Sequence, residues 1–584
     1  MKFLSRLLPW TLILSLSFYC LSAQGRESSG YKGTVVTAHD AATQAGIEML
    51  RLGGSAADAA VAAGFVLAVV EPYSSGLGGG GFALTKFRGK IQFIDFREVA
   101  PKGASRDMFV VDGIAQGRLS TDGALAAGVP GAAAGYLALQ AEDGRLERTV
   151  VLAPAIRFAR EGFAATAKFV RAANHRHQVL SKDPEAAKIF LRVNPRGAYS
   201  VPKVGERIVQ EDLAQSLELM AALGAKAFYE GPIAKKLVAD MVARKGLITA
   251  SDLRNYRIRY QEPLVGSYRG HAVVSSPPPS SGGQILLTIL NVMENLPQNR
   301  AWRSIEEIQT YLEASKRAFA DRALLGDPKF LPYLKDLIPG LIAKDRGKLL
   351  YKLTKGGVIP SLEIPPAQGA PKYFNVPDWK IGTHRESPST SHLSVIDVEG
   401  NAVSLTTTVN YSFGAGIVAK GTGIIWNDQM DDFAIAPGIP NTYGIVGSEA
   451  NAVAPGKVPL SSMSPTLVFQ GGTPDGALKM VLGSPGGSRI PTTVAQAIIN
   501  AVDHRAGALE AISEGRIHHQ HLPDMVFVEP RALDETTFEA LQARGYALKI
   551  RSPWSNATLI LVDPETGLIT AAADPRGVGT AAAE

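Results

Sequence analysis

A three-residue loop, Val398-Glu399-Gly400, joins two segments with the composition of β-strands, residues 392–397 and 402–409. Glycine at the last loop position supplies the left-handed conformation that such a loop needs, so the pattern predicts a β-hairpin. Closing the hairpin at this loop fixes the register and places Thr390 opposite Thr408. The backbones of such a pair lie about 5 Å apart, so the two hydroxyls can meet. A bulge in either strand would shift this pairing.

Small, turn-prone residues, Ser387-Pro388-Ser389, precede Thr390 in the interior of the chain. A cut before Thr390 would put a hydroxyl and a new α-amine on one residue. A threonine hydroxyl alone is a poor nucleophile, whereas an α-amine titrates near pH ~8 and can serve as its base. We therefore hypothesise self-cleavage between Ser389 and Thr390. The alternative is an ordinary polar start of a strand.

The two halves of the chain differ in their patterns. Residues 37–72 carry apolar positions at helical spacing, with Gly53-Gly54 ending one helix and Ser55 capping the next. Helical patterns with short loops continue to about residue 380, and the second half reads as strands with glycine turns. The patterns predict helices over residues 284–293, 492–501 and 536–543, and strands over 91–96, 392–397, 402–409, 423–427, 466–469, 479–482 and 558–562. This is a layered α+β arrangement built around antiparallel strands.

The glycine run 76–81 resembles a phosphate-binding loop at first sight. It lacks the Gly-Lys-Ser/Thr ending of a P-loop, and the segment before it reads as a helix rather than a strand. Glycine permits two backbones to approach closely, so we predict that this run packs against a strand.

Two segments carry groups suited to a charged ligand. Arg97 follows the predicted strand 91–96, where its planar guanidinium could bind a carboxylate; the alternative is an ion pair with Glu98. Residues 427–432 gather amide and acid groups that suit an ammonium ion. The alternatives there are a metal site or a solvated loop, although the spacing excludes an EF-hand.

Three later loops add weaker signals. Residues 437–444 are turn-rich with one aromatic residue, the composition of a lid. Residues 461–465 offer hydroxyls before a strand. Residues 483–488 precede a helix, so their backbone N–H groups could face a developing oxyanion.

Composition limits the partners and the location of the protein. The formal net charge of +6 over 584 residues, without a dense basic run, gives no support for nucleic-acid binding. Residues 1–23 read as a secretory signal whose apolar run is too short for a comfortable membrane span, and no later segment reaches the ~18 apolar residues of one. The only cysteine, Cys20, lies in that signal. We expect an exported protein, periplasmic or else secreted, without disulfides.

Three histidines, His518, His519 and His521, lie close together in the sequence. No carboxylate or cysteine near them has the spacing of zinc ligands, so we interpret them as structural or surface groups. We expect neither a metal nor another cofactor.

Six blocks of sequence, in this order, resemble γ-glutamyltranspeptidases over nearly the whole length after residue 23. They are residues 95–101, 277–283 (Pro-Pro-Pro-Ser-Ser-Gly-Gly), 390–395 (Thr-Ser-His-Leu-Ser-Val), 427–433, 459–466 and 483–489. The resemblance implies an N-terminal nucleophile hydrolase with a four-layer αββα sandwich. It implies self-cleavage into a large subunit, residues 24–389, and a small subunit, residues 390–584, which stay intertwined as one structural unit.

The resemblance also implies roles for individual residues. Thr390 would be the nucleophile that takes the γ-glutamyl group as an ester. The other roles would be support of the nucleophile by Thr408, oxyanion binding by Gly486 and Gly487, binding of the α-carboxylate by Arg97, Ser461 and Ser462, binding of the α-ammonium by Asn410, Gln429 and Asp432, and a lid aromatic at Tyr443. Ser391 departs from the second threonine of many bacterial relatives.

The implied activity is cleavage of the γ-glutamyl amide of glutathione and related compounds, with transfer to water or to an amino acid or dipeptide. One rival is a cephalosporin or other acylase on the same scaffold, which a site for a zwitterion argues against. Another is an unprocessed, inactive relative that binds glutathione in the periplasm, which the intact Thr390, Thr408 and both glycines disfavour.

Overall fold

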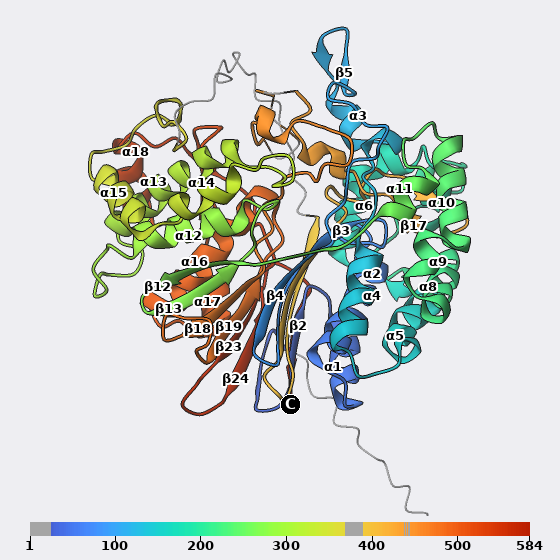
Figure 1. Cartoon of the computed structure of the whole chain (residues 1–584), viewed down its shortest axis with the longest axis horizontal. Coiled ribbons are helices and arrows are strands. Elements are labelled where there is room, and N and C mark those ends of the chain that lie inside the picture. Colours follow the sequence, from blue (N-terminus) through green and yellow to red (C-terminus); the bar gives the residue numbers. More distant parts are fainter. Residues whose placement is uncertain (1–24, 368–388, 437, 440, 442–443) are drawn as a thin grey trace, which may run out of the picture.

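The computed structural model describes residues 25–367, 389–436, 438–439, 441 and 444–584 of the chain. In these residues two seven-stranded antiparallel sheets pack face to face at the centre, and helices cover the outer face of each (Figure 1). The predicted α+β class and the αββα sandwich are therefore confirmed.

The first sheet contains the predicted hairpin at its centre. Its strand order is β11-β4-β3-β15-β14-β2-β25, with bounds Arg259–Gln261, Lys90–Asp95, Gly80–Phe87, Ala402–Thr408, Thr390–Ile396, Thr34–Thr37 and Thr580–Ala583. In the pairing of β14 with β15, Thr390 faces Thr408, so the predicted register is confirmed and no bulge shifts it.

The second sheet has the order β1-β24-β23-β19-β18-β13-β12, with bounds Glu27–Gly30, Ile569–Ala573, Thr558–Val562, Leu478–Gly483, Thr466–Gln470, His271–Ser275 and Leu264–Tyr268. Three predicted strands of the second half correspond to β18, β19 and β23. The predicted strand 423–427 is wrong in length, since only β17 (Ile424–Ile425) pairs, with β16 (Val418–Ala419). The alanine-rich β24 and β25 escaped prediction because alanine has low β-propensity and only their sheet neighbours hold them extended.

Helices of the first half cover the first sheet. They are α1 (Asp40–Arg51), α2 (Ala56–Val70) and α4 (Ala132–Asp143), with α5 (Arg148–Glu161) packed outside α2 and α8 (Glu211–Leu223) outside α5. The predicted helices in residues 37–72 are confirmed, because Gly53 follows the end of α1 and Ser55 forms a capping box with Asp58 at the start of α2.

Helices on the other side cover the second sheet. They are α12 (Gly282–Met293), α13 (Ile305–Asp321), α15 (Lys344–Thr354), α16 (Ile490–Asp503), α17 (Ala508–Ser513) and α18 (Glu535–Ala543). The helices predicted over 284–293, 492–501 and 536–543 lie within α12, α16 and α18.

Smaller elements complete the outer layers. The helices are α3 (Gly117–Thr121), α6 (Ala167–Leu180), α7 (Pro184–Phe190), α9 (Ala225–Tyr229), α10 (Pro232–Ala243), α11 (Ala250–Asn255) and α14 (Leu334–Leu341). The short strands are β5 (Val110–Val111), β6 (Ile114–Ala115), β7 (Phe163–Ala164), β8 (Arg192–Val193), β9 (Tyr199–Ser200), β10 (Arg207–Ile208), β20 (Ile517–His518), β21 (Val526–Val528) and β22 (Leu548–Ile550).

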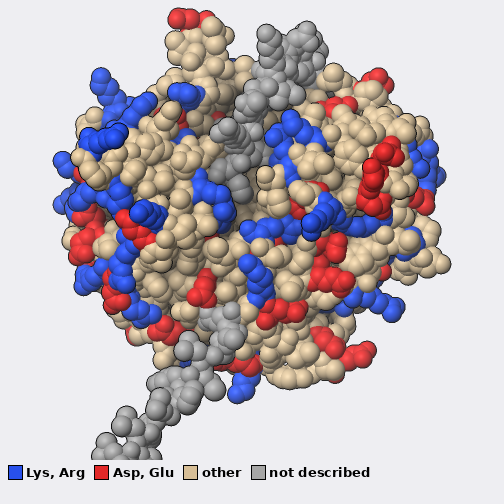
Figure 2. Space-filling view, turned by 180° about the vertical axis from the view of Figure 1, so that it is seen from behind, with Lys and Arg blue, Asp and Glu red and all other residues tan. Residues whose placement is uncertain are grey.

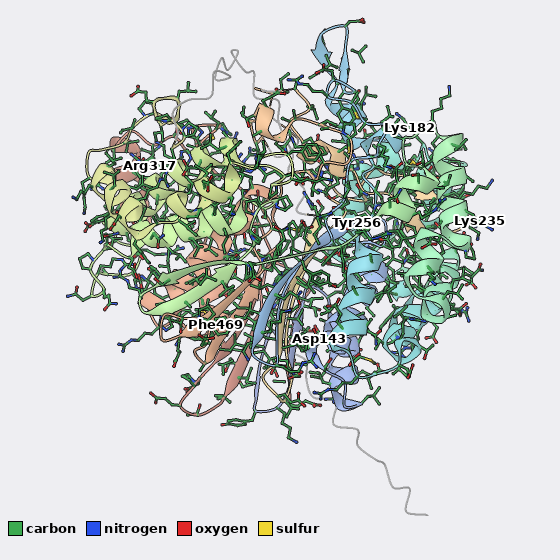
Figure 3. All side chains as sticks on the ribbon, in the orientation of Figure 1. Asp143, Lys182, Lys235, Tyr256, Arg317 and Phe469 are labelled. Atoms are coloured by element: carbon green, nitrogen blue, oxygen red, sulfur yellow. The ribbon has the colours of Figure 1, made fainter. Side chains whose placement is uncertain are left out.

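One apolar cluster joins the two sheets. It contains Phe82 and Leu84 of β3, Val481 of β19, Leu559 of β23 and Phe469 of β18, which Figure 3 labels. All of these side chains are buried. Burial of this apolar area is the main force that holds the sheets together.

The glycine run packs as predicted. A Cβ on Gly78 would lie 1.9 Å from the carbonyl oxygen of Ile425, one on Gly79 2.1 Å from that of Thr408, and one on Gly81 2.2 Å from that of Thr406. Only glycine permits these approaches; those of Gly79 and Gly81 set β3 directly against β15, and that of Gly78 is to β17.

In both sheets, strands that precede Thr390 in the sequence pair with strands that follow it. In the first sheet β14 and β15 lie between β3 and β2, and in the second β18 lies next to β13. The segments before and after Thr390 therefore share one core.

No helix in the described part of the chain is long and apolar enough to cross a membrane. Basic and acidic side chains are interspersed over the face that Figure 2 shows. This mixed surface agrees with the small net charge.

Candidate active site

Thr390 and Thr408 lie side by side at the end of the hairpin. Their Oγ atoms are 3.2 Å apart, and the Thr408 Oγ is also 3.3 Å from the carbonyl oxygen of Ser389 and 2.9 Å from the backbone nitrogen of Asn410. A hydroxyl has one proton to donate. Because Thr408 donates to Ser389 and accepts from Asn410, the Thr390 hydroxyl is the donor to Thr408.

The two threonines line a pocket that is open to solvent. The space in it that no atom fills is about 350 Å³, including the open space at its entrance. Its lining includes most of the predicted site residues: Arg97, Thr390, Thr408, Asn410, Gln429, Asp432, Ser461, Ser462 and Gly487, together with Arg322, Ile445, Leu460, Met463, Ser488 and Ile490. Residues that are hundreds of positions apart in the sequence thus meet at one point.

Arg97 is buried at the wall of this cavity. Its guanidinium forms an ion pair with Asp432, and one of its nitrogens lies 3.6 Å from a carboxyl oxygen of Glu98, so the sequence neighbour lies beside the distant partner. Tyr256, labelled in Figure 3, and Arg259 both donate to the carbonyl oxygen of Arg97 and fix its backbone.

Burial raises the pKa of Glu98 to about 8, although the nearby Arg97 acts in the opposite direction. Both carboxyl oxygens are buried without a hydrogen-bond partner among the described residues. Glu98 is therefore largely protonated near neutral pH, and Asp432 is the anion that balances Arg97.

The amide groups predicted to bind an ammonium ion lie beside Asp432. Gln429 Nε2 donates to the Asp432 carboxylate at 2.6 Å, and its Oε1 is buried without a partner in the described part of the chain. Asn410 adopts a left-handed conformation with φ of 75°, and its Nδ2 donates to the carbonyl oxygen of Asp428 at 3.0 Å. An acceptor oxygen is thus available next to an anion.

The hydroxyls of Ser461 and Ser462 lie on the cavity wall near Arg97. Ser461 and Ser280 form an isolated parallel β-bridge outside the strands, and Ser281 donates to the Ser461 carbonyl oxygen at 2.9 Å through both its backbone nitrogen and its Oγ. The turn 277–283 therefore holds the serine segment in place.

The turn before α16 has the geometry of an anion site. Gly486 and Gly487 have φ of 136° and 59°, and among the described residues none accepts a hydrogen bond from either backbone N–H. Gly487 lines the cavity. A Cβ on Gly486 would lie 2.3 Å from Ser555 Oγ, so glycine is required there as well.

Arg322, at the end of α13, is a cavity residue that the sequence patterns missed. Its guanidinium has no hydrogen-bond or ion-pair partner among the described residues, and burial lowers its pKa to about 10. Arg322 directly follows α13, where a polar residue is expected in any case. No local feature of the sequence therefore distinguishes it as a site residue.

The histidines have structural contacts. Burial lowers the pKa of His392 to about 3, and its ring bonds to Thr406 at 2.8 Å. His518, His519 and His521 are buried and bond to Thr492, Asp524 and the Ser361 carbonyl oxygen, respectively. No group of three or more metal-ligating side chains occurs in the described ranges. Tyr443 lies outside the described residues.

A threonine that starts a central strand of an αββα sandwich, next to a cavity with paired charges, defines the class of N-terminal nucleophile hydrolases. The chain belongs to the γ-glutamyltranspeptidase family, whose model matches residues 42–584.

Individual relatives agree with this assignment. The glutathione hydrolase proenzyme of Escherichia coli (strain K12) is 40% identical over 555 residues, which cover 94% of this chain and 91% of the relative. The crystal structure of cephalosporin acylase from Bacillus halodurans superposes with a TM-score of 0.81 at 25% identity, covering 98% of this chain and 99% of that one. γ-Glutamyltranspeptidase from Helicobacter pylori gives a TM-score of 0.54 at 37% identity and covers 57% of this chain and 94% of that one.

Proposed function

We propose that this chain is a self-processing γ-glutamyl hydrolase and transferase that acts on glutathione and related γ-glutamyl amides. The observation that carries the proposal is a single cavity that holds both the hydroxyl pair Thr390–Thr408 and the charge pair Arg97–Asp432. A hydroxyl can attack a carbonyl group, and paired opposite charges suit the zwitterionic end of an amino acid.

The binding roles follow from the wall of the cavity. Arg97 with Ser461 and Ser462 binds the α-carboxylate of the glutamyl group, and Asp432 with Gln429 and Asn410 binds its α-ammonium. A zwitterion replaces the Arg97–Asp432 pair with two matched ion pairs, so no buried charge is left alone. Fixing both charged groups places the γ-carbonyl near Thr390.

Maturation concerns the bond between Ser389 and Thr390. The Thr408 hydroxyl, 3.3 Å from the Ser389 carbonyl oxygen, polarises the carbonyl to be attacked. The oxygen of the Thr390 hydroxyl adds to that carbon, and the peptide C–N bond between Ser389 and Thr390 breaks. The hydroxyl proton goes to the nitrogen of Thr390, which leaves as an amine. Water then cleaves the resulting ester, which leaves a carboxylate on Ser389 and a free α-amine on Thr390.

Catalysis uses the same hydroxyl. The free α-amine of Thr390 takes the hydroxyl proton while the oxygen attacks the γ-carbonyl, and the N–H groups of Gly486 and Gly487 bind the oxyanion. The leaving amine receives the proton, and a γ-glutamyl ester of Thr390 remains. Water or the amine of an amino acid or dipeptide then takes the γ-glutamyl group from this ester, and the Thr390 hydroxyl is restored.

Replacement of the nucleophile tests maturation and activity together. Thr390→Ala removes the attacking hydroxyl, so we expect a single uncleaved chain without activity, whereas Thr390→Ser keeps a hydroxyl and should still be cleaved. The measurement is a denaturing gel with N-terminal sequencing of the smaller band, which should begin Thr-Ser-His in the wild type. A fully processed Thr390→Ala protein would contradict the proposal.

The acylase alternative is tested with two substrates. A γ-glutamyl anilide carries the α-ammonium that Asp432 and Gln429 are proposed to bind, and glutaryl-cephalosporin lacks it. We expect hydrolysis of the first and little of the second; the reverse order would favour an acylase.

We further propose export of the protein to the periplasm with removal of residues 1–23. Cell fractionation and N-terminal sequencing of the larger chain, expected to begin at Gln24, test this location.

A further inference from the structure

Within the described part of the chain, the first residues of β14 have a neighbour strand on one side only. β14 pairs with β15 from Thr390 onward, but its pairing with β2 begins at Leu393, which faces Thr37. Residues 390–392 therefore project beyond β2. A strand end that is paired on one side frays more easily than one held on both.

A buried side-chain hydrogen bond ties this segment to a residue outside the sheet. Successive side chains of a strand point to opposite faces, so Ser391 points away from the cavity that Thr390 lines. Its Oγ donates to Glu71 Oε2 at 2.6 Å, and both side chains are fully buried.

Glu71 is itself held rigidly. It follows α2 directly, and its backbone carbonyl oxygen accepts from the backbone nitrogens of Ser74 and Ser75. Its Oε1 accepts from the Tyr73 hydroxyl at 2.9 Å and from Lys168 Nζ at 2.8 Å. Burial acts to raise the pKa of Glu71, but Lys168, His39 and the hydrogen bonds keep it below its ordinary value, so the acceptor is an anion.

The need for such a contact increases on cleavage. In the uncut chain, Ser389 is tied to the site because its Oγ donates to the Asn410 carbonyl oxygen and its own carbonyl oxygen accepts from Thr408. After cleavage these bonds no longer hold Thr390, which becomes a chain end. Beyond the contacts of Thr390 with Thr408, Ser391 is then the next side chain that anchors this end, and it does so to a different element.

We propose that Glu71, supported by Lys168 and Tyr73, is a positioning residue that fixes the start of β14 through the Ser391 hydroxyl and thereby aligns Thr390 for attack. This inference rests on the proposed function. A hydrogen bond to an ionised acceptor is stronger than one to a neutral acceptor, which suits a contact that reinforces the β14–β15 pairing at a chain end.

The test compares four variants with the wild type, Ser391→Ala, Ser391→Thr, Glu71→Gln and a control, each measured as the mature, fully processed protein. Ser391→Ala removes the hydroxyl and Ser391→Thr keeps one. The control, Tyr136→Phe, removes another buried hydroxyl, 2.7 Å from Thr407 Oγ on the neighbouring strand. The readouts are kcat and KM on a γ-glutamyl anilide and the midpoint of thermal unfolding.

For Ser391→Ala we expect kcat to fall about tenfold with KM within about twofold, because substrate binding is intact and the nucleophile is misaligned. Ser391→Thr should retain kcat, and so should Tyr136→Phe. Glu71→Gln, which removes the charge of the acceptor, should lower kcat in the same way as Ser391→Ala.

Wild-type kcat in Ser391→Ala, or an equal fall of kcat in Tyr136→Phe, would overturn the inference and leave the proposed function intact. A parallel change of kcat, KM and unfolding midpoint would also overturn it, since that indicates general loosening. An inactive, uncleaved wild type would overturn the proposed function and this inference with it.

Discussion

At the scale of single residues, the site contains two charges that neutralise each other. Arg97 and Asp432 form an ion pair inside a buried wall, with Gln429 hydrogen-bonded to the same carboxylate. A ligand with only one charge would leave the other residue of the pair buried and uncompensated, which is costly. The geometry therefore favours ligands with both charges over simple acids or amines.

Removal of the cation should show this preference directly. We expect Arg97→Ala to raise KM for γ-glutamyl substrates by the equivalent of ~2–4 kcal/mol, because the α-carboxylate loses its partner and is left buried without a counter-charge. Arg97→Lys keeps the charge but loses the planar pair of N–H donors, so its KM should lie between those of the wild type and Arg97→Ala. Steady-state kinetics measure the effect, and an unchanged KM in Arg97→Ala would remove Arg97 from the site.

Glu98 gives a pH-dependent prediction. Its pKa is raised by burial from 4.5 to about 8, so the folded state holds a proton that the unfolded state has lost, and the stabilising effect declines as the pH rises from 4.5 to 8. Glu98→Gln mimics the protonated form and should therefore gain stability relative to the wild type across this range, by at most ~1.4 kcal/mol per pH unit.

Thermal unfolding of both proteins at pH 5 and pH 8.5 measures this difference. A difference between the two proteins that stays constant from pH 5 to pH 8.5 would show that Glu98 is ionised throughout.

At the scale of elements, the glycine run and the hairpin act as one unit. β3 can lie next to β15 only because Gly79 and Gly81 bring no side chain to the contact, and the same contact fixes the end of β15 at Thr408. A feature that is structural in origin thus determines the position of a site residue.

Gly79→Ala tests this coupling. The added Cβ would lie 2.1 Å from the Thr408 carbonyl oxygen, so the backbone must shift, at a cost of roughly 1–3 kcal/mol in the free energy of unfolding. We also expect slower cleavage, followed over time on a gel, because Thr408 moves. The control is Gly340→Ala in α14, where nothing lies within 4 Å of the new Cβ. Equal free energies of unfolding and equal cleavage rates in the two variants would show that the glycine run does not determine the position of Thr408.

At the scale of the whole molecule, the proposed cut divides the sequence but not the core. β14 and β15 lie between strands of the first half, and β12 and β13 extend a sheet of second-half strands. Each fragment alone would expose strand edges and much of the apolar cluster that contains Phe82 and Val481.

The two chains of the mature protein should therefore not separate under native conditions. We expect them to co-elute in gel filtration at 1 M salt, because ladder hydrogen bonds and buried apolar contacts resist screening, and to separate only in denaturant. Separation of active or folded subunits in buffer would contradict this prediction.

The sequence by itself determined the features that depend on neighbouring residues. The loop 398–400 fixed the register that pairs Thr390 with Thr408, and the glycines showed where backbones approach, because hairpin geometry and glycine conformation are local properties. The types of residue in the binding wall were also readable, although the resemblance to a family supplied their roles.

Only the tertiary structure decided which distant groups meet and how burial changes them. Arg97 and Asp432 are 335 positions apart, Ser391 and Glu71 320 positions apart, and no local pattern links either pair. The raised pKa of Glu98, the burial of Arg322 and the alanine-rich β24 and β25 likewise follow from what surrounds them. Desolvation and sheet pairing are set by the packed molecule, because their energies arise from contacts between segments that the chain brings together only on folding.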